Sequence, residues 1–315
     1  MSKFVVTGAF GFIGNHLVHR LSELGHEVVA IDKGIHENAI MQKSKIKDLP
    51  GISILEIDLC DRGALEVLPD VDGVFHLAAL NGTQNFYEKP WQTVINSTIP
   101  TLNLLDYFGS KGIGFFFYAG SSEAYAGTIT LFNGEVPTRE SVPLTISDPK
   151  ELRWSYGTSK LHGEVACFAA QAELGVPVVV GRFHNVFGPG MGIHHVIPDF
   201  IERGKNGIYE LYGANQTRSF IFVDDAVNCM LALCEKAIGE IVNIGSPNEV
   251  LISNLAEKIM EIAGWEGEIK EFSAPGGSVS RRAPNVEKLS EYIDVKNFVS
   301  LEKGLQLTLE REGLI

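Results

Sequence analysis

A tyrosine and a lysine lie four residues apart in the segment Tyr156-Gly-Thr-Ser-Lys160, which begins a helix-like stretch that continues to Phe168. Side chains four apart share one face of a helix, so the phenol and the ammonium can converge on one small site. A nearby ammonium favours tyrosinate and lowers a reference pKa of about 10. The pair therefore indicates a base that removes a hydroxyl proton as hydride leaves the same carbon. A surface helix can carry this spacing without chemistry, but its position after the fifth strand-like run favours catalysis.

A glycine-rich segment with glycines at positions 8, 11 and 14 lies between a strand-like run and a helix-like one. Small residues there let the backbone approach a pyrophosphate, which binds at the free amides and the positive dipole of the helix start. The next strand-like run ends at Asp32, whose carboxylate can accept hydrogen bonds from the ribose hydroxyls of adenosine and repels a 2′-phosphate. The pattern predicts NAD rather than NADP, a preference that Lys33 weakens. The alternative is a glycine-rich turn with a capping aspartate.

Two later strand-like runs end in residues that suit the same cofactor. Asp58 follows the third run and either holds the adenine amine or caps the next helix. His76-Leu-Ala-Ala79 ends the fourth run, where small residues again permit close approach of the backbone to the cofactor. We interpret His76 as a hydrogen-bonded core histidine rather than as a catalyst.

The elements that position these residues follow a regular rhythm. Short apolar or β-branched runs at 4–7, 27–31, 53–57, 73–77, 114–118 and 177–180 alternate with helix-period segments. We therefore expect an α/β fold, with a Rossmann-type doubly wound parallel sheet and a smaller C-terminal α/β substrate domain. From residue 181 the chain changes to Gly- and Pro-rich loops, so we expect a cofactor-binding domain over 1–180 and a substrate-binding domain over 181–315. Strands near 220–245 are expected to rejoin the first sheet.

Composition restricts the possible partners and compartment. The formal net charge of −13 disfavours binding to nucleic acid or an anionic membrane, although a few local arginines would suffice for a small anionic substrate. No apolar run approaches the length of a membrane span, and the strand-like start after one lysine leaves no room for a signal sequence. We expect a cytoplasmic protein. The four cysteines, without paired spacing, are expected to be reduced buried thiols, and no metal site is expected.

These segments together resemble the extended short-chain dehydrogenase/reductase family, specifically its NAD-dependent nucleotide-sugar epimerase and dehydratase branch. The resemblance spans nearly the whole chain. It rests on TGAFGFIG at 7–14, Asp32, Asp58, HLAA at 76–79, Asn96, SSEAYAG at 121–127, YGTSK at 156–160, RFHNVFGPG at 182–190 and RSFIFVDD at 218–225. It implies NAD as cofactor, a nucleotide-diphosphate sugar as substrate, and a homodimer that pairs through segments near 90–110 and 156–173.

The resemblance also implies roles for individual residues. Tyr156 is the implied base, Lys160 binds the nicotinamide ribose and tunes Tyr156, and Ser121 hydrogen-bonds the reacting sugar oxygen unless a one-residue slip gives that role to Ser122. The implied cofactor site comprises Gly8, Phe10, Gly11, Phe12, Ile13, Gly14, Asp32, Lys33, Asp58, Leu59, Leu77, Ala78, Ala79, Asn96, Tyr156, Lys160 and Val186. The implied substrate site comprises Asn81, Ser121, Asn185, Arg218 and Arg282, with Arg281 as an alternative to Arg282 for the diphosphate.

The expected reaction is oxidation at sugar C4, which gives a 4-keto intermediate, and C4 epimerisation is the favoured outcome. Related 4,6-dehydratases and decarboxylases place a carboxylate where this chain has Glu123, so dehydration or hexuronate decarboxylation are the alternatives. Glu123 is either a general acid or base or a solvated loop carboxylate. A non-catalytic NAD-binding sensor or scaffold is a remote alternative, against which the intact set of Ser121, Tyr156 and Lys160 argues.

Some positions depart from the family pattern. Asn285 follows Pro284 where an aspartate is usual, Phe10 stands where alanine is common, Ala126 replaces a glycine, and the segment from Asn81 to Thr83 is unusual. These differences leave the cofactor site intact and leave the identity of the sugar open.

Overall fold

The computed structural model describes residues 1–35, 38–192, 195–274 and 279–315. The chain forms two compact units, each assembled from separate segments: unit 1 contains 1–124, 146–182 and 227–242, and unit 2 contains 125–145, 183–226 and 243–315. The assignment of cofactor binding to residues 1–180 and substrate binding to residues 181–315 stays a prediction.

Seven strands form the central sheet in the order β11-β6-β5-β4-β1-β2-β3. They are β1 (Lys3–Thr7), β2 (Glu27–Asp32), β3 (Ile52–Glu56), β4 (Gly73–His76), β5 (Phe115–Ser121), β6 (Val178–Phe183) and β11 (Ile241–Ile244). The pairs β1–β2, β2–β3, β1–β4 and β4–β5 are parallel. The order reverses between β1 and β4, which is where open α/β sheets bind ligands beyond the carboxyl ends of their strands. The predicted Rossmann-type fold is confirmed.

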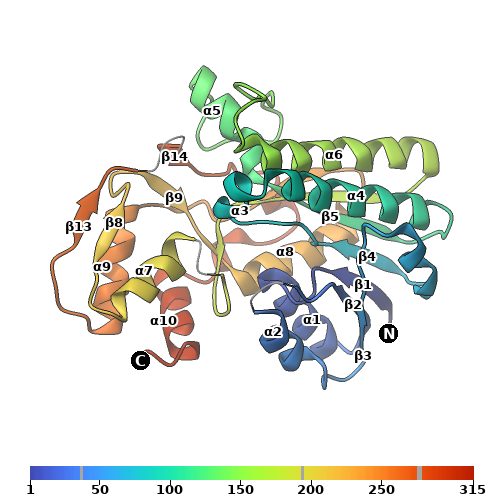
Figure 1. The fold of residues 1–315 in the computed structure, drawn as a ribbon, viewed down its shortest axis with the longest axis horizontal. Coiled ribbons are helices and arrows are strands. Elements are labelled where there is room, and N and C mark those ends of the chain that lie inside the picture. Colours follow the sequence, from blue (N-terminus) through green and yellow to red (C-terminus); the bar gives the residue numbers. More distant parts are fainter. Residues whose placement is uncertain (36–37, 193–194, 275–278) are drawn as a thin grey trace. The chain divides into compact units, whose positions relative to one another are not determined.

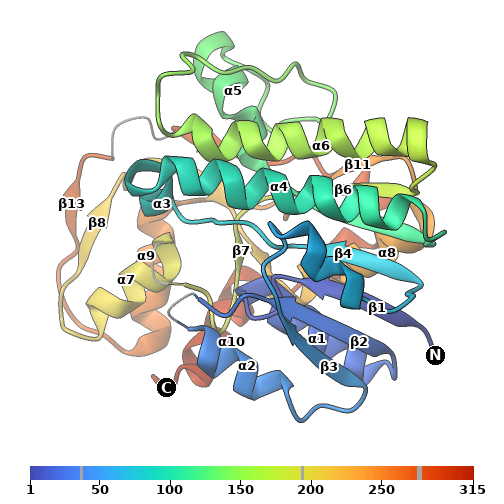
Figure 2. The same ribbon diagram turned by 45° about the vertical axis from the view of Figure 1, so that its right-hand side comes forward.

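Helices cover both faces of this sheet, as Figures 1 and 2 show, with α4 and α6 side by side on one face and α1 and α2 on the other. The helices associated with unit 1 are α1 (Phe12–Glu23), α2 (Ala39–Ile46), α3 (Thr83–Glu88), α4 (Pro90–Gly109), α6 (Trp154–Leu174) and α8 (Val223–Lys236). Short 3₁₀ turns, η1 (Arg62–Val67) and η2 (Ser122–Tyr125), complete the connections. Because both faces are covered, every residue of β5 is buried, as the phenylalanine run predicts.

Helix α6 packs against β5 through a glycine. A Cβ on Gly163 would lie 2.0 Å from the hydroxyl oxygen of Tyr118, so a larger residue cannot be accommodated without moving one element. The same hydroxyl donates to the backbone oxygen of Lys160 over 3.3 Å. This contact fixes the position of the first turns of α6 relative to β5.

The described part of unit 2 holds three small sheets and several helices. The sheets pair β10 with β7, β12-β9-β14, and β13 with β8. Its strands are β7 (Val186–Phe187), β8 (Glu210–Tyr212), β9 (Thr217–Ser219), β10 (Ile221–Phe222), β12 (Glu249–Leu251), β13 (Lys270–Phe272) and β14 (Arg281–Arg282); its helices are α5 (Ala126–Phe132), α7 (Val196–Gly204), α9 (Ile252–Ala263) and α10 (Leu301–Arg311), with 3₁₀ turns η3 (Leu289–Glu291) and η4 (Val295–Asn297). Of the two strands expected to rejoin the first sheet, β11 does, whereas the expectation is wrong for β10, which pairs with β7.

Among the described residues, no helix has both the length and the apolar character of a membrane span. The four cysteines are free thiols; Cys167, Cys229 and Cys234 are buried, whereas Cys60 is only partly covered.

Candidate active site

The glycine loop between β1 and α1 is built for close backbone approach. A Cβ on Gly14 would lie 2.1 Å from the backbone oxygen of Gly8, and a Cβ on Gly8 would lie 2.9 Å from the amide nitrogen of Ala78. Gly8 also adopts a φ of +70°, which glycine tolerates best. Helix α1 begins after Gly11 with no side chain capping its first amides, and Phe12 and Ile13 form its first turn. This helix start can therefore receive an anion.

Asp32 lies at the carboxyl end of β2, beside the glycine loop. One carboxylate oxygen accepts the amide of Phe10 over 3.2 Å, and the other accepts the amide of Gly34 over 3.0 Å. The ring of Phe10 is fully buried, so this residue presents only its backbone to the site. The Asp32 carboxylate is thus fixed in place before any ligand binds.

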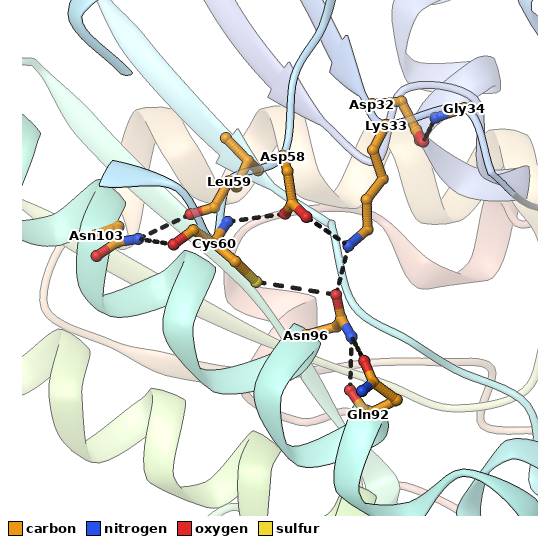
Figure 3. A network of polar contacts seen from close by, with 9 residues as sticks. All are labelled: Asp32, Lys33, Gly34, Asp58, Leu59, Cys60, Gln92, Asn96 and Asn103. Carbon is orange, nitrogen blue, oxygen red and sulfur yellow. Dashed lines mark hydrogen bonds and ion pairs between the residues drawn. The ribbon is translucent and has the colours of Figure 1, made fainter. Parts of the chain in front are cut away.

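Asp58, Lys33 and Asn96 form a polar network at the same end of the sheet (Figure 3). The Lys33 ammonium lies 3.1 Å from Oδ2 of Asp58 and 2.6 Å from Oδ1 of Asn96. Burial acts to raise the pKa of Asp58, but hydrogen bonds from the Cys60 amide and Lys33 together hold that pKa below its ordinary value. The side chain of Leu59 is buried in the core, which leaves its backbone for contacts in this network.

The segment after β4 lines the glycine loop through its backbone. The amide of Leu77 donates to the backbone oxygen of Thr7, and that of Ala78 donates to the Thr7 hydroxyl, over 3.3 and 3.2 Å. His76 is buried, with its ring nitrogens 2.8 Å from the Thr7 hydroxyl and 2.9 Å from that of Thr101. Burial, followed by the nearby Lys160 charge, lowers the pKa of His76 to about 3. His76 is therefore a neutral core residue, as the sequence indicates.

Ser121, Tyr156 and Lys160 come together where β5 ends and α6 begins. The Tyr156 ring is buried and stacks on Phe86, with ring centroids 4.7 Å apart and planes 12° from parallel. The Ser121 side chain is the neighbour that lowers the pKa of the Tyr156 phenol and so favours the phenolate. Of the two adjacent serines, Ser121 is the one that acts on the Tyr156 pKa. The choice of Ser121 over Ser122 as the catalytic hydroxyl stays a prediction.

The electrostatic setting of Tyr156 differs from the expectation. Burial raises the pKa of Tyr156 well above its ordinary value, and the negative charge of Glu123 raises it further, while the Ser121 hydrogen bond opposes both. Lys160 lies 5.7 Å from the ring centroid and donates instead to the backbone oxygen of Ala119 over 2.9 Å. The predicted lowering of the Tyr156 pKa by Lys160 is therefore not seen. A cationic group bound beside the phenol would act in the favourable direction.

Lys160 is almost fully buried, and this weakens its charged form. Burial lowers the pKa of Lys160 to about 8, against attraction from Glu164 and Cys167. Glu164 lies one turn further along α6 and forms a two-pronged ion pair with Arg182 of β6, with N···O distances of 2.9 and 2.7 Å. Both side chains are about 3% exposed. This pair ties α6 to β6 directly behind the lysine.

Glu123 also has a cationic partner. Its carboxylate lies 3.5 Å from a guanidinium nitrogen of Arg153, and both side chains are mostly buried. The Arg153 guanidinium lies 5.0 Å from the ring centroid of Trp154, within reach of a cation–π interaction. A Cβ on Gly157 would lie 3.8 Å from the Cβ of Glu123, so the start of α6 passes close to this carboxylate. Glu123 is thus held beside Tyr156 rather than solvated in a loop.

Unit 2 carries the predicted phosphate-binding arginines on neighbouring strands. Arg218 on β9 and Arg282 on β14 are register partners. Arg281 instead pairs with Glu249, because its guanidinium donates two hydrogen bonds to the Glu249 carboxylate with N···O distances of 2.8 Å. That hydrogen bonding raises the pKa of Arg281 and lowers the pKa of Glu249. The geometry therefore favours Arg282 over Arg281 as the partner of Arg218.

The remaining predicted site residues, two for the substrate and Val186 for the cofactor, have local contacts in the structure. Asn185 adopts a left-handed φ of 38°, and its amide donates to the backbone oxygen of Ser219 over 2.9 Å. Val186 is buried in β7 beside β10. Asn81 is exposed after β4, and its side-chain oxygen accepts the amide of Gly82 over 2.7 Å.

Comparison with known proteins identifies the family. The family model described as "NAD dependent epimerase/dehydratase family" matches residues 4–245. The chain is 33% identical to UDP-N-acetyl-alpha-D-glucosaminuronate decarboxylase of Bacillus cytotoxicus, over 98% of this chain and 97% of that protein. It is 31% identical to UDP-glucuronic acid decarboxylase 1 of Xenopus tropicalis, over 98% of this chain and 71% of that protein. The structure of a UDP-glucose 4-epimerase from Thermotoga maritima with UDP-glucose superposes with a TM-score of 0.86 at 28% identity, covering 99% and 98% of the two chains.

The chain belongs to the NAD-dependent epimerase/dehydratase family.

As a member of this family the protein is an NAD-dependent enzyme, and the residues at the sheet edge fit that cofactor. Glycine at positions 8 and 14 lets the loop pack its backbone where a Cβ would collide, the uncapped first amides of α1 can bind a pyrophosphate, and the Asp32 carboxylate lies beside the loop, where it can bind ribose hydroxyls. The resemblance found in the sequence is thereby confirmed for the family and the cofactor, while the roles of individual site residues stay predictions.

Three charged residues near the site were not predicted as site residues from the sequence. Glu164 follows Lys160 by four positions on an otherwise apolar helix face, a signal that could have indicated its place beside the lysine. Arg153 precedes α6 but pairs with a carboxylate thirty positions earlier, and Arg182 pairs across to α6. Only the three-dimensional packing reveals the last two.

Proposed function

We propose that the protein oxidises a nucleotide-diphosphate sugar at C4 and that C4 epimerisation is the net reaction. The observation that carries the proposal is the buried Tyr156 ring, which stacks on Phe86 and is followed one helical turn later by Lys160, with Ser121 acting to lower the pKa of the phenol. This arrangement suits removal of a proton from a secondary alcohol.

The chain's own residues hold and move the proton. Ser121 orients the sugar C4 oxygen, and Tyr156 as phenolate takes its proton while the C4–H electron pair leaves as hydride. Lys160 supplies a positive charge near the phenolate and the ribose. NAD, when bound, accepts this hydride and returns it. Return of hydride to the opposite face of the 4-keto sugar, with the proton returned from Tyr156, gives the C4 epimer with all atoms conserved.

Two observations support a nucleotide diphosphate as the rest of the substrate. Arg218 and Arg282 lie in register on adjacent strands, an arrangement that suits two guanidinium groups binding one diphosphate. The solved relative from Thermotoga maritima holds UDP-glucose. We extend that substrate class to this chain.

A second candidate is decarboxylation of a nucleotide hexuronate, and the Glu123–Arg153 pair favours it. A carboxylate held beside the 4-keto sugar can act as general acid or base once carbon dioxide is lost from C5 and the electrons of the broken bond pass to the C4 carbonyl. Two of the similar curated proteins are decarboxylases.

Product analysis separates the two candidates. We would incubate the purified enzyme and NAD with UDP-, GDP-, CDP- and dTDP-sugars, including hexuronates, and analyse products by mass spectrometry and NMR. An unchanged mass with inverted C4 supports epimerisation. Loss of carbon dioxide supports the second candidate, loss of water indicates a 4,6-dehydratase, and binding without turnover of any sugar indicates a sensor or scaffold.

Matched variants add a residue-level test. Glu123→Gln keeps the shape of the side chain and removes its charge, so an epimerase retains most of its kcat whereas a decarboxylase loses about 100-fold or more. If the two residues act together, Arg153→Met should lower kcat by about the same factor as Glu123→Gln. Arg139→Met, on the exposed surface of unit 2, is the control and should leave kcat unchanged.

We also propose that the enzyme is a cytoplasmic homodimer that pairs through α4 and α6. The outer surface of these two helices exposes Trp91, Ile99, Leu102 and Val165, and free cysteines are typical of a reducing compartment. Light scattering tests the dimer. Val165→Asp should give a monomer, and a dimer that survives this change would refute the proposed contact.

A further inference from the structure

The ammonium of Lys33 projects from the end of β2 into two acceptors that come from other elements (Figure 3). Asp58 follows β3 and lies 3.1 Å away, and Asn96 of α4 lies 2.6 Å away. We call these three residues the Lys33 clasp. It lies next to Asp32, where the proposed cofactor site places the ribose of adenosine.

The Asn96 acceptor is oriented by its own helix. Its amide nitrogen donates to the backbone oxygen of Gln92 over 2.8 Å and lies 3.2 Å from the Gln92 side-chain oxygen. Because the nitrogen is used in this way, the amide oxygen faces the Lys33 ammonium. The Asn96 side chain is therefore already oriented to accept a hydrogen bond from a cation.

The Asp58 acceptor is fixed by backbone contacts. Its Oδ1 accepts the amide of Cys60 over 2.9 Å, which leaves Oδ2 for Lys33. The loop itself is tied to α4, because the Asn103 amide donates to the backbone oxygen of Leu59 over 2.9 Å. With both acceptors held in place, the flexible lysine side chain is the part of the clasp that can move.

The charges at this edge oppose a 2′-phosphate on the adenosine ribose while Lys33 stays bound to Asp58 and Asn96. Asp32 and Asp58 contribute two negative charges and Lys33 one positive charge, and the positive charge is already shared between Asp58 and Asn96. A 2′-phosphate on the adenosine ribose needs a cation that is free to turn toward it. Released from the clasp, Lys33 would be such a cation.

We propose that Asp58 and Asn96 make the enzyme select NAD over NADP by retaining Lys33. The inference rests on the proposed position of adenosine at Asp32. Asp32 repels a 2′-phosphate directly, and the clasp withholds the neighbouring lysine that would otherwise offset that repulsion. Lys33 and Asp58 are 31% and 49% exposed, so the retention is moderate and sensitive to salt.

The test measures cofactor binding by calorimetry without any sugar, so it is independent of the proposed sugar chemistry. Dissociation constants for NAD and NADP are compared in the wild type, Asp58→Asn, Lys33→Met and the double variant. Any contact between Asp58 and adenine is common to both cofactors and cancels in the ratio of the two constants. Asp58→Asn should change the ratio of the NADP to the NAD dissociation constant by about fivefold in favour of NADP, as expected for removing one charge from a partly exposed pair.

The double variant and salt identify the cause. If Lys33 provides the gain, the ratio in Asp58→Asn with Lys33→Met returns to within about twofold of the wild-type ratio, and raising the salt concentration reduces the gain in Asp58→Asn. An equal gain with and without Lys33 would overturn the proposal, since the effect would then be general relief of negative charge. No change in the ratio for Asp58→Asn would overturn it as well.

Two further variants keep the test decisive. Asn96→Ala opens the other half of the clasp without changing any charge and should shift the ratio in the same direction by a smaller factor. If Asp58→Asn binds neither cofactor, the ratio measured for Asn96→Ala tests the proposal instead. Glu27→Gln removes the same charge from an ion pair with Lys3 at the opposite end of β2, and it should leave the ratio unchanged.

Discussion

Replacing Lys160 by methionine should change the stability of the free enzyme in a manner that depends on pH. Lys160 is 3% exposed in the fold, and burial lowers its pKa from 10.5 to about 8. Below pH 8 both the folded and the unfolded chain carry the proton, so the fold bears the full penalty of a buried charge. Between about 8 and 10.5 the unfolded chain binds more protons, so stability of the wild type rises with pH through this group.

The size of the effect follows from the two pKa values. At about 1.4 kcal/mol for each pKa unit, the difference corresponds to about 3 kcal/mol of unfolding free energy. Methionine removes this contribution but leaves the backbone oxygen of Ala119 without its 2.9 Å donor, at a cost of about 1–3 kcal/mol. The second cost does not depend on pH. The stability of Lys160→Met minus that of the wild type should therefore fall by about 3 kcal/mol between pH 7 and pH 10.5.

Urea unfolding followed by tryptophan fluorescence measures this difference at each pH. The groups that face Lys160 are Tyr118 of β5, His76 of β4, and Tyr156, Glu164 and Cys167 of α6. Burial raises the pKa values of Cys167 and Tyr118, which lowers the stability of both proteins at high pH and largely cancels in the difference. Lys150→Met, which changes an exposed lysine, is the control. A difference that stays constant with pH, or that varies equally for Lys150→Met, would refute the reasoning.

Three other outcomes are expected. Glu164→Gln should lower the unfolding free energy by about 3–5 kcal/mol in urea, because it leaves the Arg182 charge buried beside a neutral group, and Glu164→Leu combined with Arg182→Met should recover most of the loss. Gly14→Ala should abolish detectable NAD binding in calorimetry while the circular dichroism spectrum remains folded, since the added Cβ would lie 2.1 Å from a backbone oxygen of the cofactor loop. Arg282→Ala should weaken binding of a nucleoside diphosphate at least about tenfold, whereas Arg281→Ala, whose guanidinium serves Glu249, should weaken it by less than about threefold; equal losses would contradict the assignment.

Local sequence patterns were sufficient for most of the cofactor-binding scaffold. The six predicted strand runs all correspond to strands β1 to β6, because strands covered by helices on both faces are mostly apolar and β-branched. The glycine spacing was equally informative, since the positions at which a Cβ would collide with backbone are the positions that carry glycine. Such constraints act over a few residues and are therefore visible in one sequence.

Features that depend on distant partners were not accessible in this way. The choice between Arg281 and Arg282 was open until the position of Glu249, thirty-two residues earlier, was known. The expected depression of the Tyr156 pKa failed because spacing along a helix says nothing about burial or about Glu123, which arrives from β5. Likewise, β10 has the composition of a sheet strand, but its pairing with β7 depends on topology.

The segmented construction of unit 1 has a consequence for how the enzyme is made in the cell. Strand β11 borders β6 but is synthesised about 60 residues later, so roughly 3 to 12 seconds of translation separate the two strands at 5–20 residues per second. During that interval the apolar edge of β6, with Val178, Val179 and Val180 fully buried in the finished fold, has no neighbour on one side and can pair with other chains. A chain cut at residue 180 would keep that edge open permanently. We therefore expect it to aggregate, and the cofactor-binding unit must be expressed with at least the residues through β11.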